Sequence, residues 1–254
     1  MHSFEACDNI PDISKMEEKL LTITQAAELL GVSLDTLRRW DKSGRLVAIK
    51  KEGGTHRYYR EKDLKIFSSD LVKIAHDWTI DGLELPTIFY CGNSAVFQTR
   101  LIKMQDALVR SGLSENMLPL VVSVAGEIGN NSFDHNLGKW PDTPGVFFGY
   151  DAQKRQVVLA DRGLGILSTL SRVRPDLKNH IDALRVAFTE VVSGRAPEER
   201  GNGLKFVRRV VAQNPVSLFF RSGDAELRLK KDNDELFITR SQINTRGCFA
   251  VIEY

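Results

Sequence analysis

A stripe of polar side chains interrupts an apolar stretch of the sequence at residues 127–136, EIGNNSFDHN. Glu127, Asn131, Asp134 and His135 are spaced i, i+4, i+7 and i+8, so a helix would carry all four on one face. The residues just before them, 118–125, are apolar nearly all round, as in a helix inside a large domain. The stripe predicts a cavity lined by hydrogen-bonding and titratable groups. The alternative is a helix that emerges into water near Glu127.

Two glycine motifs follow the stripe. The segment 156–165, QVVLADRGLG, reads as a strand that runs into a turn containing Asp161, Gly163 and Gly165. Gly201 and Gly203 stand just before a second helix, whose apolar face begins at Leu204. Each glycine pair alone is a weak signal, because Gly-x-Gly in a loop is usually only a turn.

The order of the three motifs is more specific than any one of them. ExxxNxxxH, then DxGxG after a strand, then GxG opening a helix, resembles the GHKL superfamily of gyrase, heat-shock-90, histidine-kinase and mismatch-repair ATPases. Within it, the anti-sigma and histidine-kinase ATPase domains look most similar. The resemblance covers residues 86–254, and the alternative is an unrelated α/β domain.

The resemblance implies ATP and Mg²⁺ as cofactors and assigns roles to individual positions. Asn131 matches the residue whose amide oxygen binds magnesium, and Glu127 matches the general base that activates water. Asp161 matches the acceptor for the adenine amino group, which favours ATP over GTP. The implied ATP-binding set is Asn131, His135, Asp161, Gly163, Gly165, Gly201, Gly203 and Leu204, with a lid between Ser171 and Gly201.

The N-terminal part carries a different chemistry. Residues 21–46 read as two short helices with a tight turn between them, the first capped by Thr24 and the second by Ser33. This is a helix-turn-helix pattern, followed by an extended hairpin that turns at Gly53-Gly54. The second helix places arginines where their guanidinium groups can reach phosphates or guanine edges in a DNA major groove.

At these residues the chain resembles the MerR and excisionase-like winged helix-turn-helix family, through ITQAAELLGVSLDTLRRWDKSGRL and GGTHRYYREKDL. The resemblance implies double-stranded DNA as the partner; the alternative is a helical hairpin with a solvated basic face. The candidate DNA-binding residues are Ser33, Thr36, Arg38, Arg39, Lys42, Lys50, Lys51, His56, Arg57 and Tyr58. Residues 61–78 are too short to form the long coiled coil through which a MerR regulator dimerises. A homodimer is therefore expected to form through the larger C-terminal part, residues 86–254.

Composition and charge agree with this division. Between Ser33 and Phe67 ten Lys and Arg face five Asp and Glu, although the whole chain has a net charge of only +2. The N-terminal module is thus basic and the remainder of the chain is mildly acidic, which suggests an anionic partner for the N-terminal module. The longest apolar run is too short for a membrane span, and no basic-then-apolar leader is present, which predicts a cytoplasmic protein without membrane contact. The three cysteines form no CxxC pair.

The fold class predicted is α+β. Residues 1–19 form a tail, 20–70 the winged helix-turn-helix, 71–85 a linker and 86–254 the GHKL ATP-binding domain. That domain is expected to be a two-layer α/β sandwich, with a mixed, mostly antiparallel sheet and helices on one face. Four strand-like segments, VSLFFRS, AELRLKK, ELFITRS and CFAVIEY, complete it.

Three functions are compatible with these motifs. In the first, ATP binding and slow Mg-dependent hydrolysis control DNA binding by the front module. In the second, the body is an anti-sigma or histidine-kinase-like protein kinase, with a separate protein as substrate or His76 as acceptor. In the third, the pocket binds nucleotide without turnover and the chain is an interaction protein with a protein partner.

Overall fold

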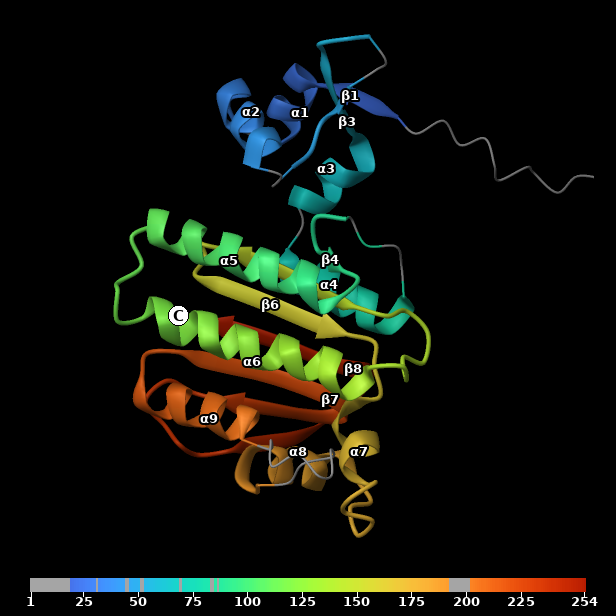
Figure 1. Cartoon of the computed structure of the whole chain (residues 1–254), viewed down its shortest axis with the longest axis vertical. Helices are drawn as coiled ribbons and strands as arrows, with labels where there is room; N and C mark the ends of the chain where they lie inside the picture. Colours follow the sequence, from blue (N-terminus) through green and yellow to red (C-terminus); the bar gives the residue numbers. More distant parts are fainter. Residues whose placement is uncertain are drawn as a thin grey trace, which may run out of the picture. The chain divides into compact units, whose positions relative to one another are not determined.

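The computed structural model describes residues 19–30, 32–43, 46–50, 53–68, 70–82, 85, 87–191 and 202–254. The chain divides into two units, residues 1–68 and 69–254. Figure 1 shows the elements of both. Within the described residues, no helix combines the length and apolar character needed to cross a membrane.

The smaller unit is a helix-turn-helix with a three-stranded antiparallel sheet in the order β1-β3-β2. Its elements are β1 (Leu20–Thr22), α1 (Ile23–Leu30), α2 (Leu34–Ser43), β2 (Ile49–Lys50), β3 (Arg57–Arg60) and α3 (Glu61–Ser68). The predicted hairpin is formed by β2 and β3, whereas β1 was not expected from the sequence. A small core of Ala26, Leu37, Tyr59 and Leu64 holds these elements together.

The helix caps of this unit are only partly those expected. Ser33 caps α2, because its Oγ accepts from the Thr36 backbone N–H at 3.1 Å. The expected cap at Thr24 is wrong: α1 begins at Ile23, and Thr22 exchanges hydrogen bonds with Gln25 instead. Thr-x-x-Gln is a capping box, which satisfies two backbone donors at the helix start.

The larger unit is built on a five-stranded sheet in the order β4-β5-β6-β8-β7, and every strand pair that the structure describes is antiparallel. The strands are β4 (Tyr90–Cys91), β5 (Val146–Asp151), β6 (Gln156–Asp161), β7 (Ser217–Leu229) and β8 (Phe237–Glu253). The helices are α4 (Leu71–Asp81), α5 (Ser94–Arg110), α6 (Leu118–Asn136), α7 (Gly165–Leu170), α8 (His180–Thr189) and α9 (Gly203–Gln213).

The four strand-like segments at the C-terminal end form two long strands rather than four. β7 and β8 pair along their length, with register shifts on both sides of Gly223. The bulge and the positive φ of Gly223, 60°, allow one strand to continue where the sequence suggested a break.

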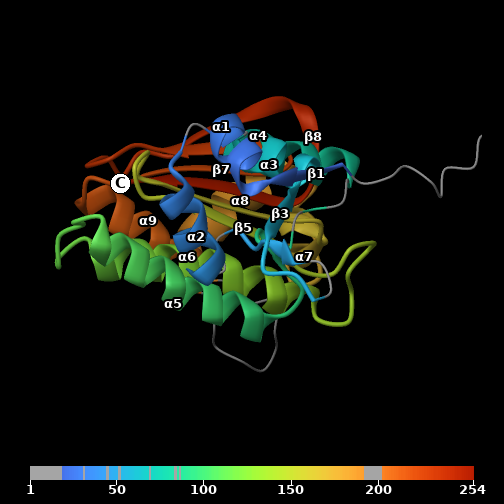
Figure 2. The same cartoon turned by 90° about the horizontal axis from the view of Figure 1, so that it is seen from above.

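Helices cover both faces of the sheet, which corrects the expectation of helices on one face only. Figure 2 shows α5 and α6 side by side along one face. Ala250 of β8 belongs to the core beneath them. Its neighbour Phe249 must point to the opposite face, and there it contacts His76 of α4. Most of the predicted linker 71–85 is therefore α4, which packs on β6 and β8.

The main core is formed where α5 and α6 meet the sheet. Phe97, Leu101, Met104 and Leu108 recur at helical spacing on α5 and are buried. Gly129 of α6 gives the Phe97 ring its space, since a Cβ there would lie 2.1 Å from Phe97 Cζ. Close packing at this point sets the distance between α5 and α6, and so helps to position the polar stripe of α6.

We predict that Gly129→Ala lowers the free energy of unfolding by about 1–3 kcal/mol, because the new methyl group must displace a buried aromatic ring. The matched control is Gly126→Ala on the same helix, whose Cβ would meet only Leu101 Cδ2, at 3.3 Å. Urea titrations of both variants measure the difference. Equal stability of the two would show that Phe97 does not depend on Gly129.

Candidate functional site

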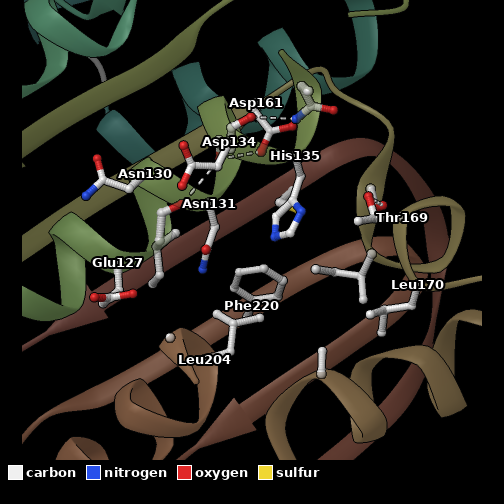
Figure 3. A pocket seen from close by; sticks show the side chains of 18 of the residues that line it. Glu127, Asn130, Asn131, Asp134, His135, Asp161, Thr169, Leu170, Leu204 and Phe220 are labelled. Carbon is white, nitrogen blue, oxygen red and sulfur yellow. Dashed lines mark hydrogen bonds between the residues drawn. The ribbon is translucent and has the colours of Figure 1, made fainter. Parts of the chain in front are cut away.

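A cavity of about 540 Å³ lies between α6, the sheet and helices α7 to α9. Figure 3 shows Glu127 and Asp161 toward opposite ends of it, with Asn131 between them. The predicted polar stripe therefore faces a cavity rather than bulk water. The residues that line it are Glu127, Ile128, Asn130, Asn131, Ser132, Asp134, His135, Asn136, Asp161, Gly165, Ile166, Thr169, Leu170, Ala187, Asn202, Gly203, Leu204, Phe206, Phe220 and Cys248.

Asp161 is the most buried acid of this cavity, with 1% of its surface exposed. It ends β6, and Ser132 Oγ donates to its Oδ2 at 2.7 Å. The Gly163 backbone N–H donates to Oδ1 at 2.8 Å, and the backbone of Cys248 on β8 contributes a third hydrogen bond. Burial raises the pKa of Asp161, and these hydrogen bonds oppose the rise by stabilising the carboxylate.

Asn136 fixes the loop that follows Asp161. Its Oδ1 accepts from the Leu164 backbone N–H at 2.8 Å, and its Nδ2 donates to the Ser132 carbonyl at 2.7 Å. A Cβ on Gly163 would lie 2.2 Å from Asn136 Nδ2. The absence of a side chain at Gly163 is thus required by Asn136, and Gly163 itself is not among the lining residues.

The other end of the cavity is formed by the start of α9. A Cβ on Gly203 would lie 2.5 Å from Glu127 Oε2 and 3.2 Å from Asn131 Nδ2. The backbone at the amino end of this helix therefore approaches both polar residues of α6 closely. Unpaired N–H groups and the helix dipole make such an end favourable for anions.

His135 lies on the same wall, and burial together with nearby Arg172 lowers its pKa. The imidazole is therefore neutral at pH 7. Asp134, for which the sequence offered no specific role, also lines the cavity. Gly201 and Lys51 lie outside the described residues, as do residues 192–200 of the predicted lid, whose earlier part contains α8.

Arg162, between Asp161 and Gly163, points away from the cavity and is 7% exposed. Its Nη1 donates to the carbonyls of Trp78 and Thr79 in α4, at 2.7 and 2.9 Å. Its Nη2 donates to Asp142 Oδ2 at 2.7 Å, which also accepts from Arg246. Partial burial alone would raise the pKa of Asp142, but the hydrogen bonds from Arg162 and its neighbours lower it to about 2.

The smaller unit presents a separate candidate surface. Arg38, Arg39 and Lys42 of α2 are exposed, as are Ser33, Lys50 and His56, whereas Thr36 and Tyr58 are half-buried. Arg57 is engaged within the unit, because its Nε donates to Asp41 Oδ2 at 2.6 Å. Asp41 also accepts from the Ala48 backbone N–H. This pair ties the hairpin to α2, which gives Arg57 a role in positioning the surface.

Sequence reasoning missed Ser132, Asn136 and Cys248. The first two had a detectable signal, since they are polar, four residues apart, and lie on the helix that carries the stripe. Cys248 had none, because it reaches Asp161 only through the pairing of β8 with β6.

Comparison with known proteins identifies the front of the chain. Residues 20–67 match the helix-turn-helix domain family. The chain is 46% identical over 55 residues to the transcriptional repressor DcmR of Methylorubrum extorquens, and 33% identical over 63 residues to the type II methyltransferase M.Eco47II of Escherichia coli. These matches cover 22% and 25% of this chain, and only 21% and 15% of the respective relatives. The chain therefore carries a helix-turn-helix domain of the DNA-binding kind.

We predict that Asp142→Asn lowers the free energy of unfolding by about 1–2 kcal/mol at pH 7, after allowing for solvent screening of a partly exposed group. The folded pKa, about 2, is below the unfolded value of 3.8, so this stabilisation is present above pH 4 and is lost as the pH falls toward 2.

Urea titrations between pH 7 and pH 2 should therefore show wild type and Asp142→Asn converging at the acid end. Asp106→Asn, an exposed acid on α5, is the control and should leave stability unchanged at pH 7. A constant difference across the pH range would contradict the assignment to Asp142.

Proposed function

We propose that the larger unit is an ATP-binding domain of the GHKL type, and that its nucleotide state controls DNA binding by the helix-turn-helix unit. The observation that carries this proposal is the buried Asp161 carboxylate at one end of a cavity whose other end joins Glu127, Asn131 and the start of α9. The volume of the cavity is in the range of small-molecule sites, and its lining combines apolar side chains such as Ile166, Leu204 and Phe220 with the polar stripe of α6.

Hydrogen bonding at Asp161 favours adenine. When ionised, the Asp161 carboxylate only accepts hydrogen bonds, and donors from Ser132, Gly163 and Cys248 hold its two oxygens in place. A ligand group that hydrogen-bonds to this carboxylate must therefore be a donor. The adenine amino group is a donor, whereas guanine presents a carbonyl oxygen at the corresponding position.

The opposite end suits a triphosphate with Mg²⁺. Gly203 lets the backbone of α9 come within reach of phosphate oxygens, and His135, neutral at pH 7, can donate a hydrogen bond to them. Asn131 would offer its amide oxygen as a ligand to a magnesium ion. The other ligands of the ion would be phosphate oxygens and water, as is common for magnesium. The residues fit the group, and magnesium would neutralise the charge that develops on the phosphates.

Glu127 is the candidate general base. Its carboxylate lies beside the start of α9, next to Asn131, where it can accept a proton from water directed at the terminal phosphate. The hydrolysis expected is slow, as in a switch. Neither a kinase activity nor binding without turnover is favoured by a separate observation; His76 of α4 packs edge-on against Phe249.

The output of such a switch is DNA binding. Helix-turn-helix domains place their second helix in the major groove, and α2 here exposes Arg38, Arg39 and Lys42. A repressor among the similar proteins agrees with a regulatory role. Two copies of the chain would present two reading helices to two half-sites, as is usual for this class.

We predict that Glu127→Ala reduces ADP production from Mg-ATP by roughly 10²–10⁴-fold while ATP still binds. Asp161→Asn should weaken ATP binding by about 10–100-fold, because the variant no longer offers a charged acceptor. Calorimetry and a coupled ADP assay measure the two quantities. Asp134→Asn, a lining acid without an assigned role, is the control. Undiminished turnover in Glu127→Ala would eliminate Glu127 as the base.

We predict that Arg38→Ala with Arg39→Ala weakens binding to a mixed-sequence duplex and reduces the slope of log K against log salt by about 2, because each arginine neutralises about one phosphate. ATP affinity should be unchanged. Lys103→Ala with Arg110→Ala removes the same charge from exposed positions on α5 and is the control. If fluorescence anisotropy at several salt concentrations shows equal effects for both pairs, α2 is not the DNA-reading helix.

A further inference from the structure

Helix α4 is the first element of the larger unit. Only residues 69 and 70 separate it from α3, the last helix of the helix-turn-helix unit. It packs on β6 and β8, with Ala75, Trp78 and Thr79 buried. A conformational change that is transmitted along the chain from one unit to the other must therefore pass through α4.

One charged side chain, that of Arg162, hydrogen-bonds to the carboxyl end of α4. Arg162 Nη1 donates to the carbonyls of Trp78 and Thr79 in the last turn of the helix. The Trp78 carbonyl also accepts from the Gly82 backbone N–H at 3.0 Å, so the guanidinium adds a second donor to it. The same guanidinium is anchored by Asp142. Gly82, which ends α4 with a φ of 67°, leaves room for this arrangement, since a Cβ there would lie 3.0 Å from the Arg162 guanidinium.

Arg162 is also part of the loop that joins Asp161 to Gly165, two residues that line the cavity. Asp161 on one side of it faces the cavity, and Gly163 on the other side packs on Asn136. Successive residues at a strand end point to opposite faces, so Asp161 and Arg162 project toward the cavity and toward α4 respectively. Because Asp161 and Arg162 are joined by a peptide bond, a shift of this loop also displaces the backbone that carries the guanidinium bound to α4.

We infer that Arg162 is a positioning residue that couples occupation of the cavity to the carboxyl end of α4, and through α4 to DNA binding by the helix-turn-helix unit. This inference rests on the proposed function, and it names the route by which that function is regulated. It requires that nucleotide binding and DNA binding alter each other's affinity by the same factor, because coupling between two sites is reciprocal.

The test measures this coupling factor in the full chain. Affinity for a non-hydrolysable ATP analogue with Mg²⁺ is determined with and without saturating duplex DNA, for wild type and Arg162→Lys. Lysine keeps the charge but cannot hold Asp142 and two carbonyls at once in the fork geometry of arginine. The expected result is a wild-type factor of about 5–100, within the usual range for allosteric coupling, and a factor near one in Arg162→Lys.

Gly82→Ala tests the contact between Arg162 and α4 by a change on the α4 side. Its new Cβ would lie 3.0 Å from the guanidinium, and alanine is also strained at the Gly82 φ of 67°, so both effects act on the carboxyl end of α4. Gly82 does not line the cavity, so the variant should bind the ATP analogue and still lose most of the coupling. Hydrogen exchange of the α4 amides gives a second measurement. In wild type the analogue should change the exchange of the last turn of α4, and in both variants this change should be absent.

The outcomes separate the inference from the function on which it rests. Analogue binding in wild type with no change in α4, or coupling that survives in Arg162→Lys and Gly82→Ala, overturns the route through Arg162 and leaves the nucleotide site intact. Failure of wild type to bind the analogue overturns the proposed function and the inference together. Loss of coupling in both variants, with nucleotide binding retained, supports the inference.

Discussion

The burial of the Asp161 carboxylate is the constraint on which the larger unit depends. A buried charge is costly unless donors surround it, and the donors here come from three places far apart in the sequence. Ser132 comes from α6, the Gly163 N–H from the following loop and a backbone group from Cys248 on β8. These three contacts require α6 to cross the sheet above the end of β6 and require β8 to pair beside it.

The same strand end buries a second charge on the opposite side. Arg162 donates to the Trp78 and Thr79 carbonyls of α4 and to an acid, Asp142, whose pKa falls to about 2. Two adjacent residues of opposite charge thus join the cavity wall on one face of the sheet to a helix on the other. Hydrogen bonds to charged groups, which are stronger than neutral ones, therefore connect this strand end to elements on both faces of the sheet.

Much of the fold was predictable because it rests on local patterns. The stripe on α6, the strand that ends at Asp161 and the helix-turn-helix pattern depend on residues close in the sequence. The predictions that were wrong concern segments whose structure depends on tertiary packing. The linker expected at 71–85 is mostly α4, because its apolar side chains find a sheet face that the sequence does not reveal. The four expected strands form two, because β7 and β8 stay paired on both sides of the register shifts at Gly223.

The sequence by itself determined which residues could form a polar cavity wall and which segment reads as a helix-turn-helix domain, since both follow from spacing along a helix and from short motifs. Only the tertiary structure decided that Ser132, Asn136 and Cys248 surround the Asp161 loop, that Arg57 belongs to the ion pair with Asp41, and that Arg162 holds α4. These contacts join residues brought together by strand pairing and helix packing, and no periodicity in a single sequence encodes such pairs.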